Sequence, residues 1–255
     1  MGISFNIKKF FLTVCAVIMT SALLAQQTCS DSLSVQNRLT IHDSHKMNVY
    51  DFAVPSVVLG VSAWSVYNPW LIERRNDFQD LFSARTHKTR IDNYIQYLPT
   101  ASLYMLNMAN VKGTHNFKDR TIILAISAAT MELCVYSMKA VLKEPRPDNG
   151  STKSFPSGHT ATAFMGAELL YMEYRDSYPW IGIIGYGVAT ATGFLRIYND
   201  RHWVNDVLAG AAIGIISTRF AYWIYPKIFR DTSHTPSVVC MPFYNGAGLN
   251  IAVFF

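Results

Sequence analysis

The sequence has few charged residues and no long run of charge of either sign. Only 15% of its 255 residues are Asp, Glu, Lys or Arg, whereas 50% are hydrophobic and the mean hydropathy is +0.14. This composition excludes a disordered chain and a coiled coil, because both need more charge, and 14 glycines are too few for collagen. The net charge is +5, but the basic residues are scattered, so we expect no nucleic-acid partner.

The sequence also lacks paired cysteines. Its four cysteines show no C-x-x-C spacing, so neither a zinc site nor a disulfide scaffold is expected: Cys15, Cys29, Cys134 and Cys240. A Cys29–Cys240 disulfide requires both ends of the mature chain to lie outside the cell, which an even number of membrane crossings would achieve. Cys134 lies in an apolar stretch, where we expect it to pack.

The N-terminus has the pattern of a secretory signal peptide. Lys8 and Lys9 precede an apolar run, Phe10 to Ala25, that ends in small residues. This pattern predicts cleavage after Ala25, with an uncleaved first membrane helix as the alternative. The next segment, residues 26–51, is polar.

Six later stretches are apolar enough to approach the roughly 20 residues that a membrane-spanning helix needs. Three have no charged residue: Phe52–Ile72, Asn93–Val111 and Ser177–Leu195. Three others are interrupted by a charged residue: Thr121–Met138, Thr160–Tyr174 and Val207–Pro226. We therefore predict an all-α, polytopic membrane bundle of about six transmembrane helices, forming one domain over residues 52–228.

The interrupting charges are Glu132, Glu168 and Arg219. Charges at such depth usually face protein, so we expect them to pair or to line a cavity. Snorkelling to the membrane interface is the alternative. The tail, residues 229–255, ends in an alternating stretch typical of a barrel strand, but one strand cannot close a barrel.

Two polar segments between the predicted spans carry residues suited to phosphate chemistry. Lys139 and Arg146 bring two cations to one helix end, and Arg196 adds a third. Three cations can surround the non-bridging oxygens of a phosphate through charge-assisted hydrogen bonds. Ser157 and Gly158 open the next helix, where free backbone N–H groups and the helix dipole favour an anion.

Two histidines complete the predicted site. His202 and Asp206 are four residues apart, so on a helix the carboxylate can hold one imidazole nitrogen while the other attacks phosphorus. His159 is then the general acid for the leaving alkoxide. We expect this set to work without a metal or any other cofactor. His115 has no such company in the sequence, and we expect it to be a surface residue.

These segments resemble the motifs of the type 2 phosphatidic acid phosphatase (PAP2) superfamily, which includes bacterial lipid phosphatases, soluble class A acid phosphatases and vanadium haloperoxidases. The first motif is matched by Lys139 and Arg146-Pro147, and the second by Pro156-Ser157-Gly158-His159. The third is matched by Arg196, His202 and Asp206, although Leu195 stands where serine is usual. The resemblance covers roughly Tyr94 to Ile216.

The resemblance implies hydrolysis of a phosphomonoester or a diphosphate. Membrane helices favour a lipid substrate whose phosphate lies at headgroup level, and a lipid A phosphatase is our first choice. The alternatives are an undecaprenyl diphosphate phosphatase and a general phosphatidic acid or phosphatidylglycerol phosphate phosphatase. A haloperoxidase would share the motifs, and a soluble acid phosphatase would leave the membrane on alkaline washing. A membrane transporter, from a different class, predicts that three charged residues matter more than His202: Glu132, Glu168 and Arg219.

We expect a multi-pass protein of the bacterial inner membrane, with its site facing the periplasm. Simple counting conflicts with this side, since a cleaved signal and three subsequent crossings would place the motifs in the cytoplasm. Either Phe10–Ala25 does not translocate the polar segment after it, or Phe52–Ile72 does not cross the membrane.

Overall fold

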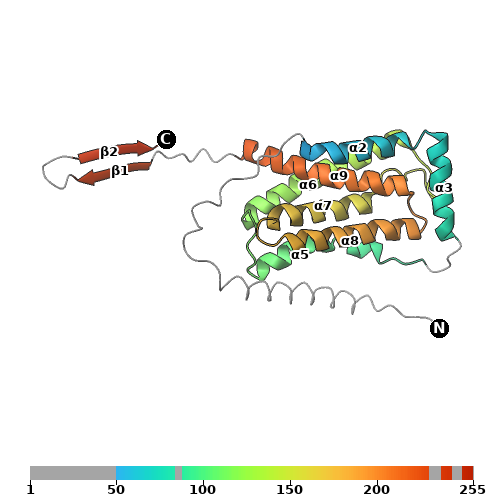
Figure 1. Cartoon of the computed structure of the whole chain (residues 1–255), viewed down its shortest axis with the longest axis horizontal. Coiled ribbons are helices and arrows are strands. Elements are labelled where there is room, and N and C mark those ends of the chain that lie inside the picture. Colours follow the sequence, from blue (N-terminus) through green and yellow to red (C-terminus); the bar gives the residue numbers. More distant parts are fainter. Residues whose placement is uncertain (1–49, 84–87, 230–236, 243–248, 255) are drawn as a thin grey trace. The chain divides into compact units, whose positions relative to one another are not determined.

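The computed structural model describes residues 50–83, 88–229, 237–242 and 249–254 (Figure 1). The expected signal segment and Cys29 lie outside these residues. The chain divides into two compact units, one ending at Ala221 and the other beginning at Tyr222.

The first unit is helical, and its last helix continues into the second unit. The helices are α2 (Tyr50–Trp64), α3 (Pro69–Ser83), α4 (Asp92–Ile95), α5 (Leu98–Met108), α6 (Phe117–Leu142), α7 (Gly158–Tyr174), α8 (Pro179–Tyr198) and α9 (Val204–Ile228). Among the described residues, three of them are long and apolar enough to cross a membrane: α6, α8 and α9. The predicted all-helical membrane bundle is confirmed for this unit.

Two predicted spans are wrong as single helices. Phe52–Ile72 is broken into α2 and α3 ahead of Pro69, and Asn93–Val111 is broken into α4 and α5 ahead of Pro99. Proline lacks a backbone N–H and its ring clashes with the carbonyl four residues earlier, which belongs to Ser65 for Pro69 and to Ile95 for Pro99, so both breaks have a local cause. The 15 residues of α2 cover about 22 Å at 1.5 Å per residue, less than the roughly 30 Å of a bilayer core.

Helix α7 is at the centre of the packing. It contacts α4, α5, α6 and α8, and Figure 1 shows it between α8 and α9. The approach of α9 depends on two glycines, because a Cβ at Gly210 would lie 2.4 Å from the Ser157 carbonyl oxygen and one at Gly214 would lie 2.4 Å from that of Ala161. Side chains at these positions would push α9 away from the start of α7.

The charges inside the predicted spans do not all behave alike. The Arg219 Nε donates to Glu168 at 2.7 Å, and the Tyr186 hydroxyl donates to the same carboxylate, so the pairing predicted for Glu168 and Arg219 is confirmed. Glu132 is exposed on α6 and is not part of this group. Cys134 is likewise exposed, so our expectation that it packs is wrong.

A second buried charge group lies where α7 ends. The Glu173 carboxylate accepts from Arg120 Nε at 3.2 Å and lies 2.8 Å from His115 Nδ1. The Glu173 and Arg120 side chains are 0% and 1% exposed. Our expectation that His115 is an isolated surface residue is therefore wrong, because this contact joins the α5–α6 connection to α7.

In the second unit, β1 (Ser237–Pro242) and β2 (Leu249–Phe254) pair antiparallel, with Val238 opposite Val253. The alternating sequence at the end of the tail thus forms one strand of a two-stranded sheet.

Candidate active site

The three motifs meet at one end of the helical unit. Lys139 lies in the last turn of α6, Arg196 in the last turn of α8, and His159 in the first turn of α7. His202 lies just before α9 and Asp206 in its first turn. Antiparallel packing of these helices therefore gathers residues that are up to 67 positions apart in the chain.

His202 and Asp206 form the buried centre of this site. The His202 Nδ1 lies 3.3 Å from Asp206 Oδ2, and both side chains are at most 2% exposed. The same carboxylate oxygen accepts hydrogen bonds from the Ser154 hydroxyl at 2.5 Å and from the Trp203 backbone N–H at 2.9 Å. The carboxylate is thus held in place, and its contact with Nδ1 leaves Nε2 as the nitrogen that can attack.

Burial controls the protonation state of His202. Loss of solvent lowers its pKa to about 4, although the hydrogen bond and the charge of Asp206 oppose this shift. The positive charges of Arg196 and Lys139 lower the pKa further. At pH 7 the imidazole is therefore neutral and has a lone pair available.

The two arginines leave donors available beside this histidine. Arg196 Nη1 donates to Asp92 at 2.5 Å, whereas the buried Arg196 Nε has no partner among the described residues. The buried Arg146 Nε likewise has none among them. Buried donors without an acceptor are costly, so this corner of the protein is suited to an anion.

Lys139 supports the loop between the first two motifs. Its Nζ donates to the carbonyl oxygens of Lys153 and Ser154, at 3.0 and 3.2 Å. The cation therefore positions Ser154, which holds Asp206, while it adds positive charge to the site.

The start of α7 contributes differently from our prediction for Ser157. The Ser157 N–H donates to the Asp206 carbonyl at 3.0 Å, and its hydroxyl caps α7 through Thr160. The Ser157 N–H is thus used within the protein, and its hydroxyl accepts from the Thr160 N–H, so its phosphate-binding role stays a prediction. The first-turn N–H groups of Gly158 and His159 have no acceptor within a helix, which suits an anion.

His159 is held by α4. Its Nε2 lies 2.9 Å from Asn93 Oδ1. Burial, and then the charge of Arg196, lowers the pKa of His159 to about 4, so this imidazole is neutral at pH 7 in the protein by itself. A phosphate dianion beside it would raise the pKa of His159, so that the imidazole takes up from water the proton that a general acid needs.

Helix α3 adds a clamp that the motifs do not contain. Arg75 forms an ion pair with Glu144, and its guanidinium lies 4.6 Å from the centre of the Trp203 ring. The Trp203 Nε1 donates to the Pro145 carbonyl at 2.8 Å. Pro145, which precedes Arg146, and Trp203, which follows His202, are therefore held together by a hydrogen bond.

Sequence reasoning missed several of these residues: Arg75, Asp92, Asn93, Glu144 and Ser154. Spacing in the sequence does not predict the contacts of these residues, because the partner in each contact is distant in the chain. Ser154 carried the best signal, since it is a polar residue directly ahead of the Phe155-Pro156-Ser157 turn.

We expect Ser154→Ala to lower kcat about tenfold while KM changes little. The hydroxyl orients Asp206, and hence His202, without reaching the substrate, and one hydrogen bond to a charged group is worth roughly 1.5–3 kcal/mol. Steady-state phosphate release at saturating substrate measures this effect. Ser127→Ala is a matched control, because that buried hydroxyl donates to Ile123 within α6. An equal loss in both variants would assign the effect to general destabilisation.

A model of the PAP2 superfamily matches residues 120–230, which include all eight predicted site residues. Over this segment, which is less than half of its length, the chain resembles the PAP2 superfamily. It is 40% identical over 149 residues to the lipid A 1-phosphatase of Porphyromonas gingivalis, covering 58% of this chain and 34% of that protein. It is 36% identical over 73 residues to an undecaprenyl-diphosphatase of Sulfolobus acidocaldarius, covering 29% of this chain and 32% of that protein.

The matched segments thus span about a third of the length of each of these relatives. Among solved structures, a transmembrane PAP2-type phosphatidylglycerolphosphate phosphatase from Bacillus subtilis matches with a TM-score of 0.54 and 21% identity. The match covers 71% of this chain and 99% of that one, and it shows the same fold. Its three span-length helices, among the residues that the structure describes, indicate a membrane protein.

Proposed function

We propose that this protein is a membrane lipid phosphatase that works through a phosphohistidine on His202. One observation carries the proposal: Arg146 and Arg196 present buried donors without an acceptor in the described chain, beside a buried, neutral histidine. Such donors suit the charged oxygens of a phosphoryl group in the transition state.

The geometry supports a two-step reaction. The Nε2 of His202 attacks phosphorus, the bond from phosphorus to the alkoxide oxygen breaks, and His159 gives that oxygen a proton. Asp206 stabilises the positive charge that develops on the His202 ring. Water then attacks the phosphohistidine, His159 takes a proton from the water, and phosphate leaves with His202 restored.

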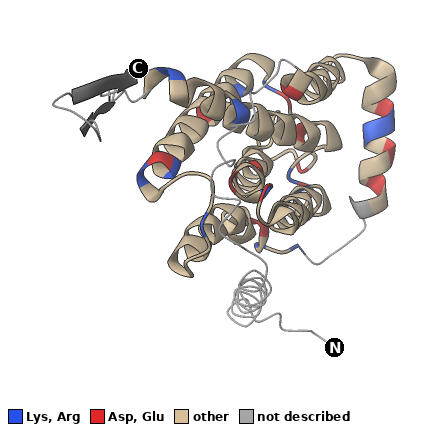
Figure 2. Cartoon of the chain, turned by 60° about the vertical axis from the view of Figure 1, so that its left-hand side comes forward, with Lys and Arg blue, Asp and Glu red and all other residues tan. Residues whose placement is uncertain are grey.

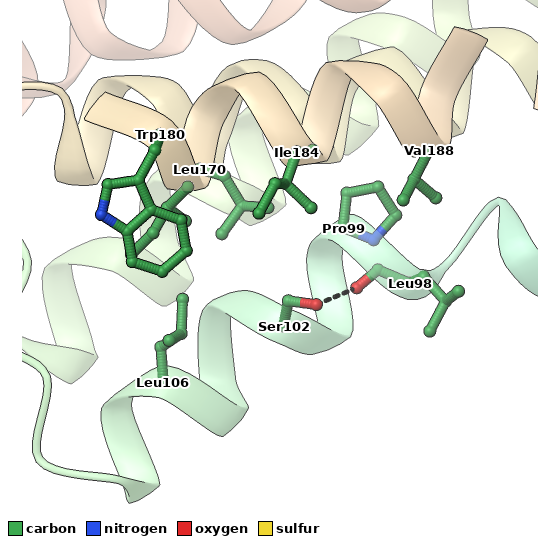
Figure 3. Close-up of a pocket in the computed structure, with 10 residues that line it drawn as sticks. Leu98, Pro99, Ser102, Leu106, Leu170, Trp180, Ile184 and Val188 are labelled. Atoms are coloured by element: carbon green, nitrogen blue, oxygen red, sulfur yellow. Dashed lines mark hydrogen bonds between the residues drawn. The ribbon is translucent and has the colours of Figure 1, made fainter. Parts of the chain in front are cut away.

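An apolar pocket supports a lipid substrate over a soluble ester (Figure 3). It is lined from α5, α7 and α8, with Leu98 and Val188 at one end and Leu106 and Trp180 at the other. The Ser102 hydroxyl in the lining already donates a hydrogen bond to the Leu98 carbonyl oxygen, at 2.8 Å. Leu98, at one end of the pocket, is five positions after Asn93, which contacts His159, and the apolar lining suits an acyl chain.

Among lipid phosphates, we infer that lipid A is the substrate, with undecaprenyl diphosphate and phosphatidic acid or phosphatidylglycerol phosphate as alternatives. The support is the identity to the Porphyromonas gingivalis lipid A 1-phosphatase, 40% over 149 residues. A lipid A substrate fits an enzyme of the bacterial inner membrane whose site faces the periplasm.

The course of α2 bears on this orientation. The Asp51 carbonyl at its start accepts from Arg219, thirteen positions after Asp206, whereas α3 beyond it reaches the site through Arg75. Helix α2 therefore runs toward the site end. A periplasm-facing site then places Tyr50 nearer the cytoplasm than the site end of α2.

Phosphate release by the detergent-purified protein tests the proposed function. The panel is lipid A, undecaprenyl diphosphate and phosphatidic acid, with His202→Ala as the blank. We expect release from lipid A to exceed the other two. Release equal to the blank on all three would overturn the phosphatase assignment.

Two additions test the chemistry of the same assay. We expect EDTA to leave the rate unchanged, because the described nucleophile, acid and cations form a complete set. Vanadate is expected to inhibit as a phosphate mimic. Strong inhibition by EDTA would contradict the metal-free mechanism.

A further inference from the structure

A polar cavity of about 440 Å³ lies against α3, beside the active site. Its lining includes Asn76 and Asp80 of α3, Lys88, and three residues of the motif loops: Asp148, Asp200 and Trp203. The volume falls within the roughly 300–1,000 Å³ of small-molecule sites. We call it the headgroup cavity.

The headgroup cavity borders the residues that handle phosphate. Pro147 also lines the cavity and directly follows Arg146. Asp200 and Trp203 stand on either side of Arg201-His202 in the sequence. The group esterified to a phosphate on His202 needs space next to these residues. The cavity is therefore placed to receive that group.

The lining is suited to hydroxyl groups. Carboxylates accept hydrogen bonds only, so they pair with hydroxyl donors, and the Trp203 indole offers an apolar surface to a ring. Two of the carboxylates are already engaged, Asp148 by Arg201 at 3.1 Å and Asp200 by Lys88 at 3.1 Å. Asp80 and Asn76 have no ion pair or side-chain hydrogen bond to any residue that the structure describes.

Helix α3 presents Asp80 and Asn76 together, because residues four apart share a helix face. Figure 2 shows charged residues along α3, and only some of them line the cavity. Asp77, one position after Asn76, instead pairs with Arg74 at 3.0 Å. The carboxylates of α3 thus have two different environments.

We propose that the headgroup cavity binds the sugar ring that carries the scissile phosphate, with Asp80 and Asn76 as the residues that recognise its hydroxyls. This inference rests on the proposed phosphatase function and names its substrate class, a phosphorylated glycolipid. A prenyl diphosphate would bring its second phosphate toward three carboxylates and one lysine, which is unfavourable. A diacylglycerol phosphate has no ring to fill the cavity.

The test compares Asp80→Ala with Asp77→Ala in the full-length protein. Both residues lie on α3 and both changes remove one carboxylate, so helix propensity and net charge change equally. We measure kcat/KM for lipid A and for phosphatidic acid with each variant. Asp80→Ala is expected to lower kcat/KM for lipid A, relative to kcat/KM for phosphatidic acid, about tenfold. The loss arises mainly from a higher KM for lipid A, as expected for one lost hydrogen bond. Asp77→Ala is expected to keep the wild-type ratio.

The outcomes separate the two proposals. An unchanged ratio in both Asp80→Ala and Asn76→Ala, in an active protein, would overturn the sugar-binding role while the phosphatase function stands. An equal change in Asp77→Ala would assign the effect to surface charge and also overturn it. A wild-type protein no more active than His202→Ala on every lipid would instead reject the phosphatase function.

Discussion

Replacing His202 with alanine is expected to lower kcat by at least about a thousandfold. In the proposed mechanism the side chain supplies the attacking nitrogen, and no other described imidazole is held by a carboxylate at the meeting point of the three motifs. Without the nucleophile, only the binding groups still accelerate the reaction. In comparable enzymes they account for a small part of the rate enhancement. Phosphate release from lipid A at saturating concentration measures it.

His202→Asn is a useful companion, because it keeps polar volume in the buried site without a nucleophilic nitrogen. Both variants should unfold within a few degrees of the wild type, as judged by thermal unfolding in detergent. A folded His202→Ala protein with more than a tenth of wild-type activity would place the nucleophile elsewhere.

Replacing Glu173 with alanine is expected to reduce the free energy of unfolding by about 3–5 kcal/mol. The change leaves the Arg120 guanidinium buried without its carboxylate, and an uncompensated buried charge is strongly destabilising. It also removes the contact that ties His115 to α7. Denaturant unfolding in detergent micelles, monitored by circular dichroism, measures the loss.

The exposed carboxylate Asp176, three positions further along, provides the matched control. It lies 3.9 Å from Arg175 and is 76% exposed, so Asp176→Ala should change the stability by less than about 1 kcal/mol. The double variant Arg120→Met with Glu173→Leu should recover much of the loss, because it removes both charges. A Glu173→Ala protein as stable as Asp176→Ala would show that the buried pair contributes little.

How far the sequence predicts the site depends on whether a residue's role is local. His202 and Asp206 are four positions apart, and the Ser157 cap precedes α7 directly, so their contacts can be derived from helix geometry. Asp92 pairs with Arg196 across 104 positions, and Arg75 pairs with Glu144 across 69. Such contacts depend on how helices pack, which spacing within one segment does not report.

The same distinction explains the two helices that were predicted as longer spans. Hydropathy averages over a window, so it detected apolar stretches at Phe52–Ile72 and Asn93–Val111 but not the breaks within them. Each break precedes a proline, which was visible in the sequence. Only the fold shows the effect of the breaks, since they allow α3 and α4 to approach the site with Arg75 and Asn93.

By itself, the sequence determined the helical membrane class, the three motifs and their order, and the residue types on which the proposed phosphate chemistry depends. These properties depend on composition and on short-range spacing. The tertiary structure alone decided how His202 is desolvated, which donors of Arg146 and Arg196 stay available, and where α3 places the headgroup cavity. Burial and cavities arise from contacts between distant segments, and close packing, as at Gly210 against Ser157, sets them to within an ångström.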